Sequence, residues 1–244
     1  MTYAPVNGLQ LYYEVRGRGR PLVLLHGGLM TIDLNFGPLL DPLAAGRQVI
    51  AVELQGHGHT ADTRPEMTIE ALAADVIGLL DHLGIGQADI LGFSLGGLVA
   101  VEAALAAPSR VGRLIVASAN PHRPPGREST PPGDDLMPTP ADFQAMHDAY
   151  DAAAPDPAHF GESAARTTKM VHEVPGKASE LRSLHAPVLL MFGDRDFSPL
   201  PDVLELLGLL PDAQLAVLPG TTHVSVTRRP AEVLALTSRF LDAP

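Results

Sequence analysis

The chain has 244 residues, contains no cysteine and carries a formal net charge of −11. Disulfides, thiol chemistry and cysteine-based zinc sites are therefore excluded, and the negative charge argues against a nucleic-acid partner. With 45% hydrophobic residues, the chain can bury a substantial core as one large domain, with room for an insertion.

The N-terminus has no basic segment followed by an apolar stretch, so we expect no signal peptide. No apolar run reaches the roughly 18 residues that a membrane span requires. We therefore predict a cytoplasmic protein with no membrane partner.

The first half of the chain alternates short apolar runs with helical patterns. Asn7-Gly8 lies between two strand-like runs and predicts a hairpin of residues 2–6 and 9–15. The next predicted elements are a strand at 22–25, a helix at 35–45 interrupted by Gly37, Pro38 and Pro42, a strand at 48–54, a helix at 68–83, a strand at 88–93, a helix at 95–107 and a strand at 111–119. Purely apolar strands are typical of a parallel sheet covered on both faces.

The pattern changes after Ala119. Residues 120–140 are crowded with proline, glycine and charge, which predicts a loop, and two less apolar helices are predicted at 141–154 and 157–174. The strand and helix alternation then resumes with a strand at 187–192, a helix at 199–210, a strand at 213–218 and a helix at 229–241. We therefore predict an α/β core formed by residues 1–119 and 186–244, with a cap or lid inserted at 120–185.

The pentapeptide Gly92-Phe93-Ser94-Leu95-Gly96 lies between a predicted strand and a predicted helix. This is the context that a G-x-S-x-G nucleophile elbow requires, because the flanking glycines permit a turn that is too tight for side chains. The turn would expose the Ser94 hydroxyl above the end of the sheet. It would also direct the Leu95 N–H, at the start of a helix, toward whatever Ser94 attacks.

A serine hydroxyl needs an adjacent base, and His223 is the candidate because it follows the last predicted strand in a short glycine-bearing loop. The imidazole in turn needs a carboxylate, which Asp196 or Asp194 can supply. These segments all follow predicted strands, and the carboxyl ends of parallel strands meet at one edge of a sheet. His26, His57 and His59 are interpreted as structural residues.

Five segments, in this order along the chain, make the sequence similar to the α/β-hydrolase superfamily over nearly its whole length. They are His26-Gly27-Gly28, Gly56-His57-Gly58, Gly92-Phe93-Ser94-Leu95-Gly96-Gly97, Gly193-Asp194-Arg195-Asp196 and Gly220-Thr221-Thr222-His223. The resemblance implies an α/β-hydrolase fold with a mostly parallel central sheet of about eight strands, flanked by helices and carrying a helical cap. Glu53 departs from the aspartate that the family often has at this position.

The resemblance also implies roles for individual residues. Ser94, Asp196 and His223 would form the catalytic triad, because the second aspartate of a G-D-x-D segment is usually the acid of the family. The oxyanion hole would combine the N–H groups of Gly28 and Leu95, with Leu29 as the neighbouring alternative to Gly28. No cofactor and no metal would be needed.

These residues predict a serine hydrolase of the carboxylesterase type that acts on a small, fairly apolar substrate through an acyl-enzyme on Ser94. Lactonase, carbon–carbon bond hydrolase, amidase and cofactor-free perhydrolase activities use the same triad and stay open. A small-molecule receptor on the same fold is the alternative from another class. The sequence does not specify the natural substrate or the oligomeric state.

Overall fold

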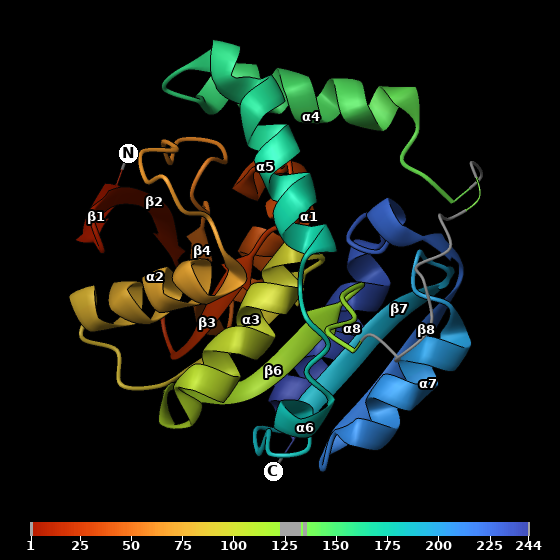
Figure 1. Cartoon of the computed structure of the whole chain (residues 1–244). Coiled ribbons are helices and arrows are strands. Elements are labelled where there is room, and N and C mark those ends of the chain that lie inside the picture. The colour runs from red at the N-terminus through yellow and green to blue at the C-terminus, as the bar shows by residue number, and fades with distance from the viewer. Residues whose placement is uncertain (1, 123–132, 134–135, 244) are drawn as a thin grey trace.

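The computed structural model describes residues 2–122, 133 and 136–243. Its middle layer is an eight-stranded sheet with the order β1-β2-β4-β3-β5-β6-β7-β8, and helices cover both faces (Figure 1). The strands are β1 (Thr2–Val6), β2 (Leu9–Arg16), β3 (Arg20–Leu25), β4 (Arg47–Val52), β5 (Ala88–Phe93), β6 (Val111–Ala117), β7 (Val188–Arg195) and β8 (Ala213–Thr222).

The direction of the strands sets where loops can converge. β1 pairs with β2 and β2 with β4 in antiparallel fashion, whereas every pair from β4 through β8 is parallel. The chain places β4 on one side of β3 and then β5 on the other side. Such a reversal opens a crevice beyond the carboxyl ends of the strands, which is where sheets of this kind bind ligands.

The helices follow the strands in the alternation that the sequence predicts. They are α1 (Ile32–Ala44), α2 (Ile69–His82), α3 (Leu95–Ala106), α4 (Pro140–Ala153), α5 (Phe160–His172), α6 (Ala178–Leu181), α7 (Leu200–Leu209) and α8 (Pro230–Leu241), with single 3-10 turns at Pro108–Arg110, Pro157–His159 and His223–Ser225. In the described part of the chain, none of these helices is both long and apolar enough to cross a lipid bilayer.

Each face of the sheet has its own apolar core. On one face, α2, α3 and α7 bury side chains such as Leu72, Val99 and Val203 against the strands. On the other face, α1 and α8 bury Phe36 and Phe240. Neighbouring positions of a central strand alternate between these two clusters, as the period of a strand requires.

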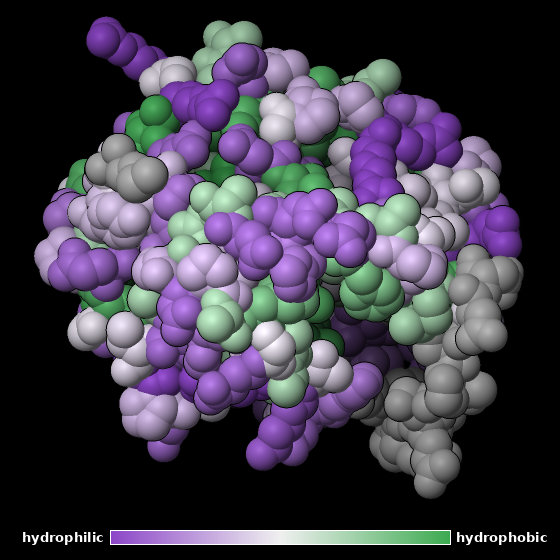
Figure 2. All heavy atoms as spheres, turned by 90° about the horizontal axis from the view of Figure 1, so that it is seen from above, coloured by the Kyte–Doolittle hydropathy of each residue, from purple (hydrophilic) through white to green (hydrophobic). Residues whose placement is uncertain are grey.

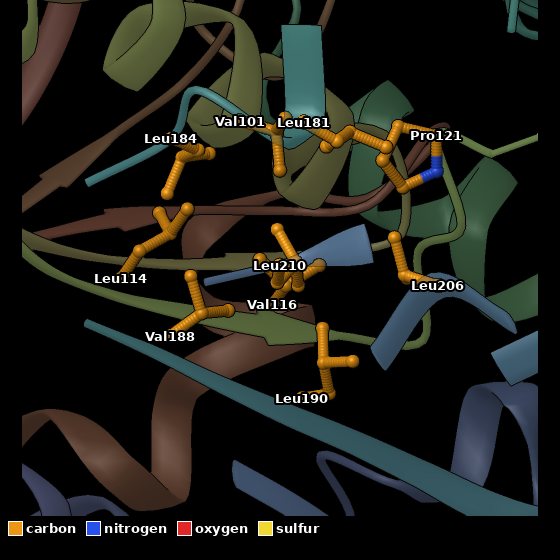
Figure 3. A pocket seen from close by; sticks show the side chains of 10 residues that line it. All are labelled: Val101, Leu114, Val116, Pro121, Leu181, Leu184, Val188, Leu190, Leu206 and Leu210. Carbon is orange, nitrogen blue, oxygen red and sulfur yellow. The ribbon is translucent and has the colours of Figure 1, made fainter. Parts of the chain in front are cut away.

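One part of the first core lies where α3, α6 and α7 meet β6 and β7. Ten apolar side chains converge there, among them Val101, Leu114, Leu181 and Leu206 (Figure 3). The space between them leaves no room for a water molecule. We therefore interpret it as core packing rather than as a ligand site.

Helix α1 begins earlier and runs more continuously than the sequence predicts. The Thr31 hydroxyl accepts a hydrogen bond from the Leu34 N–H (3.3 Å) and caps the helix, and Pro38 and Pro42 lie inside it. A proline inside a helix costs about 3 kcal/mol. Here the helix buries an apolar face against the sheet, which offsets that cost.

The last two parallel strands are longer than the sequence predicts. β7 continues through Arg195 and β8 through Thr222, so parts of two predicted loops belong to the sheet. The register shifts between Gly193 and Arg195, and Arg195 pairs with Thr222. This irregularity allows pairing to continue beyond the apolar residues that mark the strands in the sequence.

The predicted cap contains the two expected helices, α4 and α5, and Figure 1 shows both above the sheet. The predicted loop at 120–140 lies largely outside the described residues. The short α6 is an element that the sequence does not predict. Leu181 and Leu184 at its end belong to the main core, so this part of the segment packs with the sheet. The division at 120 and 185 stays a prediction.

Candidate active site

Ser94 lies at the turn between β5 and α3, with φ 51° and ψ −116°. This backbone conformation is strained for a residue with a side chain. A Cβ atom added at Gly92 would lie 2.2 Å from the Gly96 oxygen, and one added at Gly96 would lie 2.0 Å from the Leu25 oxygen. Only glycine fits at these two positions, which explains the spacing of the pentapeptide.

The structure brings together the three predicted residues Ser94, His223 and Asp196. His223 Nε2 lies 2.9 Å from Ser94 Oγ, and His223 Nδ1 lies 2.9 Å from Asp196 Oδ1. For Nε2 to accept the serine proton, Nδ1 must carry the ring proton and donate a hydrogen bond to Asp196 Oδ1. The three side chains therefore form one hydrogen-bonded chain across the carboxyl ends of β5, β7 and β8.

The close approach of the carboxyl-terminal ends of β7 and β8 explains how Asp196 reaches His223. A Cβ atom at Gly193 would lie 1.9 Å from the Thr221 oxygen, so the missing side chain lets the two segments touch. His223 then begins a 3-10 turn, in which Ser225 Oγ accepts a hydrogen bond from the Thr222 N–H (2.8 Å). This local structure holds the imidazole between the two neighbouring loops.

Asp196 is buried, and its side chain has no exposed surface. Burial raises the pKa of this carboxyl, but the hydrogen bond and charge of His223, the Ser118 side chain and the Ser198 N–H together outweigh burial and hold its pKa below the ordinary value. Asp196 is therefore ionised at neutral pH. A negative charge at this position can stabilise a protonated His223.

Asp194 has a different environment, although it is only two residues away. It is exposed and accepts a hydrogen bond from the Thr221 N–H (3.0 Å), and among the described residues the carboxylate that bonds to His223 is that of Asp196. The N–H groups of Gly220 and Thr221 hold the pKa of Asp194 below its ordinary value. Asp194 therefore fixes the loop that carries His223.

Two aromatic rings hold the imidazole of His223. Phe197 stacks on it with ring centroids 4.2 Å apart and planes 12° apart, and Phe93 lies with its centroid at 5.2 Å. Only 12% of the His223 side chain is exposed. The rings limit rotation of the imidazole and shield its hydrogen bonds from water.

The predicted oxyanion donors are adjacent. A Cβ atom added at Gly28 would lie 4.0 Å from Leu95 Cβ. The Gly96 N–H donates to the His26 oxygen (3.0 Å) and ties the loop after β3 to the start of α3. Among the described residues, no hydrogen bond uses the N–H of Gly28 or of Leu95. Leu29, the alternative donor, has a positive φ of 62°.

Three histidines and Glu53 support the loops around the site. His26 is fully buried, and its Nε2 accepts from the Leu54 N–H (3.0 Å). His57 is also buried, and its ring centroid lies 5.0 Å from that of His26. Glu53 accepts from the His59 N–H (2.6 Å) and from the Ile32 N–H (3.2 Å). The glutamate therefore fixes this turn.

Helix α5 is tied to the core beside the site. Asp62, whose side chain is only 1% exposed, pairs with Arg166 and lies 3.2 Å from His159 Nε2. Ser163 Oγ donates to the Gly56 oxygen (2.5 Å). One turn further along, the Thr167 methyl would lie 3.0 Å from a Cβ atom at Gly28. The inner face of α5 therefore covers the loop that carries a predicted oxyanion donor.

Figure 2 views the molecule from the side on which α4 and α5 lie. Hydrophilic side chains cover most of this face, and hydrophobic ones appear in small groups between them. Within the described part of the chain, this face therefore shows no broad apolar patch.

Several residues of the site carry no signal in the sequence. Phe197, Ser118 and Thr167 reach the site through contacts between segments that are distant in the chain. Phe197 directly follows Asp196, but that position alone does not predict that its ring stacks on His223. Ser118 is the last residue but one of the strand predicted at 111–119, which offers no reason to single out a serine.

The architecture has known counterparts. A family model described as alpha/beta hydrolase fold matches residues 20–159. A solved meta-cleavage product hydrolase, CumD from Pseudomonas fluorescens IP01, superposes with a TM-score of 0.84 over 99% of this chain and 97% of that chain, at 22% identity. At that identity, the likeness shows the fold alone.

Curated relatives match over different lengths. The 2-hydroxy-6-oxononadienedioate/2-hydroxy-6-oxononatrienedioate hydrolase 2 of Pseudomonas putida is 30% identical over 251 residues, covering 88% of this chain and 85% of that protein. The dihydrolipoyllysine-residue acetyltransferase component of the acetoin cleaving system, also from Pseudomonas putida, is 43% identical over 120 residues, covering 48% of this chain. That match and two others span only 32% to 43% of the relatives' own length.

Proposed function

Because the chain belongs to the α/β-hydrolase family, we propose that it is a serine hydrolase that cleaves an ester-like bond of a small, fairly apolar substrate. The observation that carries this proposal is the hydrogen-bonded chain from Ser94 through His223 to Asp196, with 2.9 Å at each step. In a hydrolase of this type, a base within hydrogen-bond reach activates the serine.

In the proposed reaction, Ser94 Oγ attacks the substrate carbonyl while His223 Nε2 takes its proton. The N–H groups of Gly28 and Leu95 stabilise the oxyanion, and the loss of one such donor costs about 2.7–4 kcal/mol in a comparable site. The imidazolium returns the proton to the departing alcohol and leaves an acyl-enzyme. Water, deprotonated by His223, then attacks the acyl carbon, and the acid departs as Ser94 regains its proton.

The surroundings of the triad support a small, fairly apolar substrate. Phe197 is partly exposed where it stacks on His223, and Leu29 is partly exposed next to Gly28. The Thr167 methyl of α5 lies against Gly28. We propose that α4 and α5, within the predicted cap at 120–185, set the size of the acyl group that fits. Aromatic and aliphatic walls of this kind favour apolar groups over charged ones.

A carbon–carbon bond hydrolase is the second candidate. The observation that favours it is the relative from Pseudomonas putida that matches 88% of this chain and is named as a 2-hydroxy-6-oxononadienedioate hydrolase. The same serine and histidine could act on a ketone carbonyl whose leaving group is a stabilised carbanion. Parallel assays with nitrophenyl esters and a 2-hydroxy-6-oxo-dienoate would rank the two activities by kcat/KM.

The first prediction tests the nucleophile. Ser94→Ala should lower kcat/KM for p-nitrophenyl acetate and butyrate by at least roughly 10³-fold, because the acyl-enzyme of the proposed reaction forms on this hydroxyl. Ser109→Ala, which changes an exposed serine in a 3-10 turn after α3, is the control and should match the parent protein.

A fluorophosphonate label located by mass spectrometry gives a second readout. The label should attach to Ser94 in the parent protein and in Ser109→Ala. Hydrolysis that persists in Ser94→Ala, or a label on another residue, would refute the assignment of the nucleophile.

A further inference from the structure

One oxygen of the buried Asp196 carboxylate has no partner within the described part of the chain. Oδ1 faces His223 Nδ1 at 2.9 Å and the Ser198 N–H at 3.4 Å. Oδ2 is buried and makes no hydrogen bond to any described residue. A buried charged oxygen without a donor is costly, so a donor is expected beside it.

A second unpartnered group lies beside this carboxylate. Ser118 follows the last residue of β6, is only 3% exposed, and its hydroxyl also lacks a hydrogen-bond partner among the described residues. The Ser118 N–H donates to the Met191 oxygen (2.8 Å), which anchors the residue to β7, the strand that leads into Asp196. Hydrogen bonding by the Ser118 side chain is also among the causes that lower the pKa of Asp196, so the hydroxyl lies near the carboxylate, although the two groups do not meet the geometry of a hydrogen bond.

Ser118 has a positive φ of 53°, close to the φ of 51° at Ser94. The described residues include four non-glycine positions with positive φ, namely Asn7, Leu29, Ser94 and Ser118. Asn7 belongs to the hairpin turn, whereas Leu29 follows Gly28, Ser94 contacts His223 and Ser118 directly follows β6. A left-handed residue with a side chain costs roughly 1–2 kcal/mol, and such strain is concentrated at functional sites.

We propose that Ser118 is a positioning residue whose hydroxyl donates a hydrogen bond to Asp196 Oδ2. The proposal rests on the proposed serine-hydrolase function and adds a fourth residue behind the triad. A rotation of the hydroxyl toward Oδ2 satisfies both unpartnered atoms at once. It fixes the plane of the carboxylate, so that Oδ1 stays directed at His223.

The electrostatic consequence has a definite sign. Among the residues that the structure describes, His223 is the titratable side chain that lowers the pKa of Asp196, whereas Asp194 is bonded to the Thr221 N–H. The Ser118 bond draws negative charge toward Oδ2. Without it, more charge remains on Oδ1 and favours the protonated form of His223, so the acid limb of kcat/KM moves to higher pH.

Two substitutions separate the hydroxyl from the backbone strain. Ser118→Gly removes both the hydroxyl and the strain, and Ser118→Ala removes only the hydroxyl. Both should lower kcat for p-nitrophenyl acetate by roughly tenfold, with KM nearly unchanged. Both should also move the acid limb upward. Thr237→Val is the control, because it removes another buried hydroxyl, on α8, that has no partner among the described residues.

A double substitution tests whether Ser118 acts through the carboxylate. In an Asp196→Asn background, Ser118→Gly should cause no further loss of kcat, because its target charge is already absent. Full additivity of the two losses would contradict the proposal, and so would kcat and pH profiles of Ser118→Gly and Ser118→Ala that match the parent protein.

A measurement on the protein without substrate tests the role of Ser118 separately from the proposed function. The downfield proton signal of His223 Nδ1–H, assigned by its loss in His223→Gln, should shift and exchange faster in Ser118→Gly but not in Thr237→Val. An unchanged signal would overturn the role of Ser118. Failure of the hydrolase function would appear separately, as no ester hydrolysis and no fluorophosphonate label on Ser94 in the parent protein.

Discussion

At the scale of single residues, burial and local contacts give two neighbouring aspartates different properties. Asp196 is enclosed and directed at His223, whereas Asp194 is exposed and bonded to the Thr221 N–H. Both pKa values lie below the ordinary value, for different reasons: the imidazole acts on Asp196, and backbone N–H groups act on Asp194. One aspartate therefore places its charge at His223, and the other holds the loop that carries His223.

This difference predicts unequal effects of the two amide substitutions. Asp196→Asn should lower kcat by roughly 10²–10⁴-fold, because the amide can favour the wrong tautomer of His223 and cannot stabilise its cation. Asp194→Asn keeps an oxygen that can accept from the Thr221 N–H and should lower kcat by no more than a few fold. Ester hydrolysis by the two variants, assayed side by side, checks this. Equal losses would show that Asp196 has no special role.

At the scale of elements, the site depends on how closely the strand, turn and helix around Ser94 approach the neighbouring strand. The Gly96 N–H reaches the His26 oxygen, and its Cα lies against the Leu25 carbonyl. The elbow is thus held by β3 as well as by its own strand, β5. This coupling keeps the predicted oxyanion donors Gly28 and Leu95 adjacent.

Alanine at one elbow glycine should therefore destabilise the whole fold. Gly96→Ala places a Cβ atom 2.0 Å from the Leu25 oxygen and should cost about 2–4 kcal/mol of unfolding free energy. Gly208→Ala, on the exposed side of α7 with no neighbour within 4 Å, should instead add about 0.5–1 kcal/mol. Urea denaturation of both variants measures the contrast, and similar free energies for the two would contradict it.

At the scale of the whole molecule, two neutral imidazoles are buried under the loops of the site. Burial, helped by the proximity of His57, lowers the pKa of His26 to about 3. Burial also lowers the pKa of His57. Both folded-state pKa values lie below the ordinary value of about 6.5. As pH falls, the unfolded chain therefore binds protons before the folded chain does.

The stability that His26 contributes is thus complete above about pH 6.5 and is lost as the pH falls toward 3. Each buried imidazole can add a slope of up to about 1.4 kcal/mol per pH unit in this window. His26→Gln should flatten the dependence of unfolding free energy on pH. His185→Gln, at an exposed histidine, should leave the slope unchanged. Urea titrations between about pH 7.5 and 4.5 span the window in which the unfolded imidazole titrates and measure the slopes. Parallel curves for the parent protein and His26→Gln would contradict the prediction.

Local patterns are sufficient to predict most of the fold. The hairpin at Asn7-Gly8 and the helix capped by Thr68 depend on neighbours in sequence, and both are confirmed. Helix α1 starts earlier than the sequence predicts, because two prolines obscure a helix that its buried face stabilises. Strands β7 and β8 end later than the sequence predicts, because pairing there continues through polar residues.

In the candidate site too, features marked by local sequence are predicted and features that depend on long-range packing are not. Ser94, Asp196 and His223 could be placed at strand ends because glycine-rich turns mark those ends in the sequence. Phe197, Ser118 and Thr167 could not be predicted, because their contacts depend on how three separate segments pack. The sequence therefore predicts the proposed reacting groups better than the groups that hold them.

The positive φ angles at Ser94 and Ser118 lower the stability of the fold at two positions that the proposed catalysis needs. Glycine at either position would relieve roughly 1–2 kcal/mol of strain, partly offset by the greater freedom of the unfolded chain. A directed-evolution campaign that selects for thermal survival alone would therefore enrich glycine at these positions. Its most durable clones would lose the proposed nucleophile or the residue behind its acid, so a thermal screen of this protein must also select for turnover.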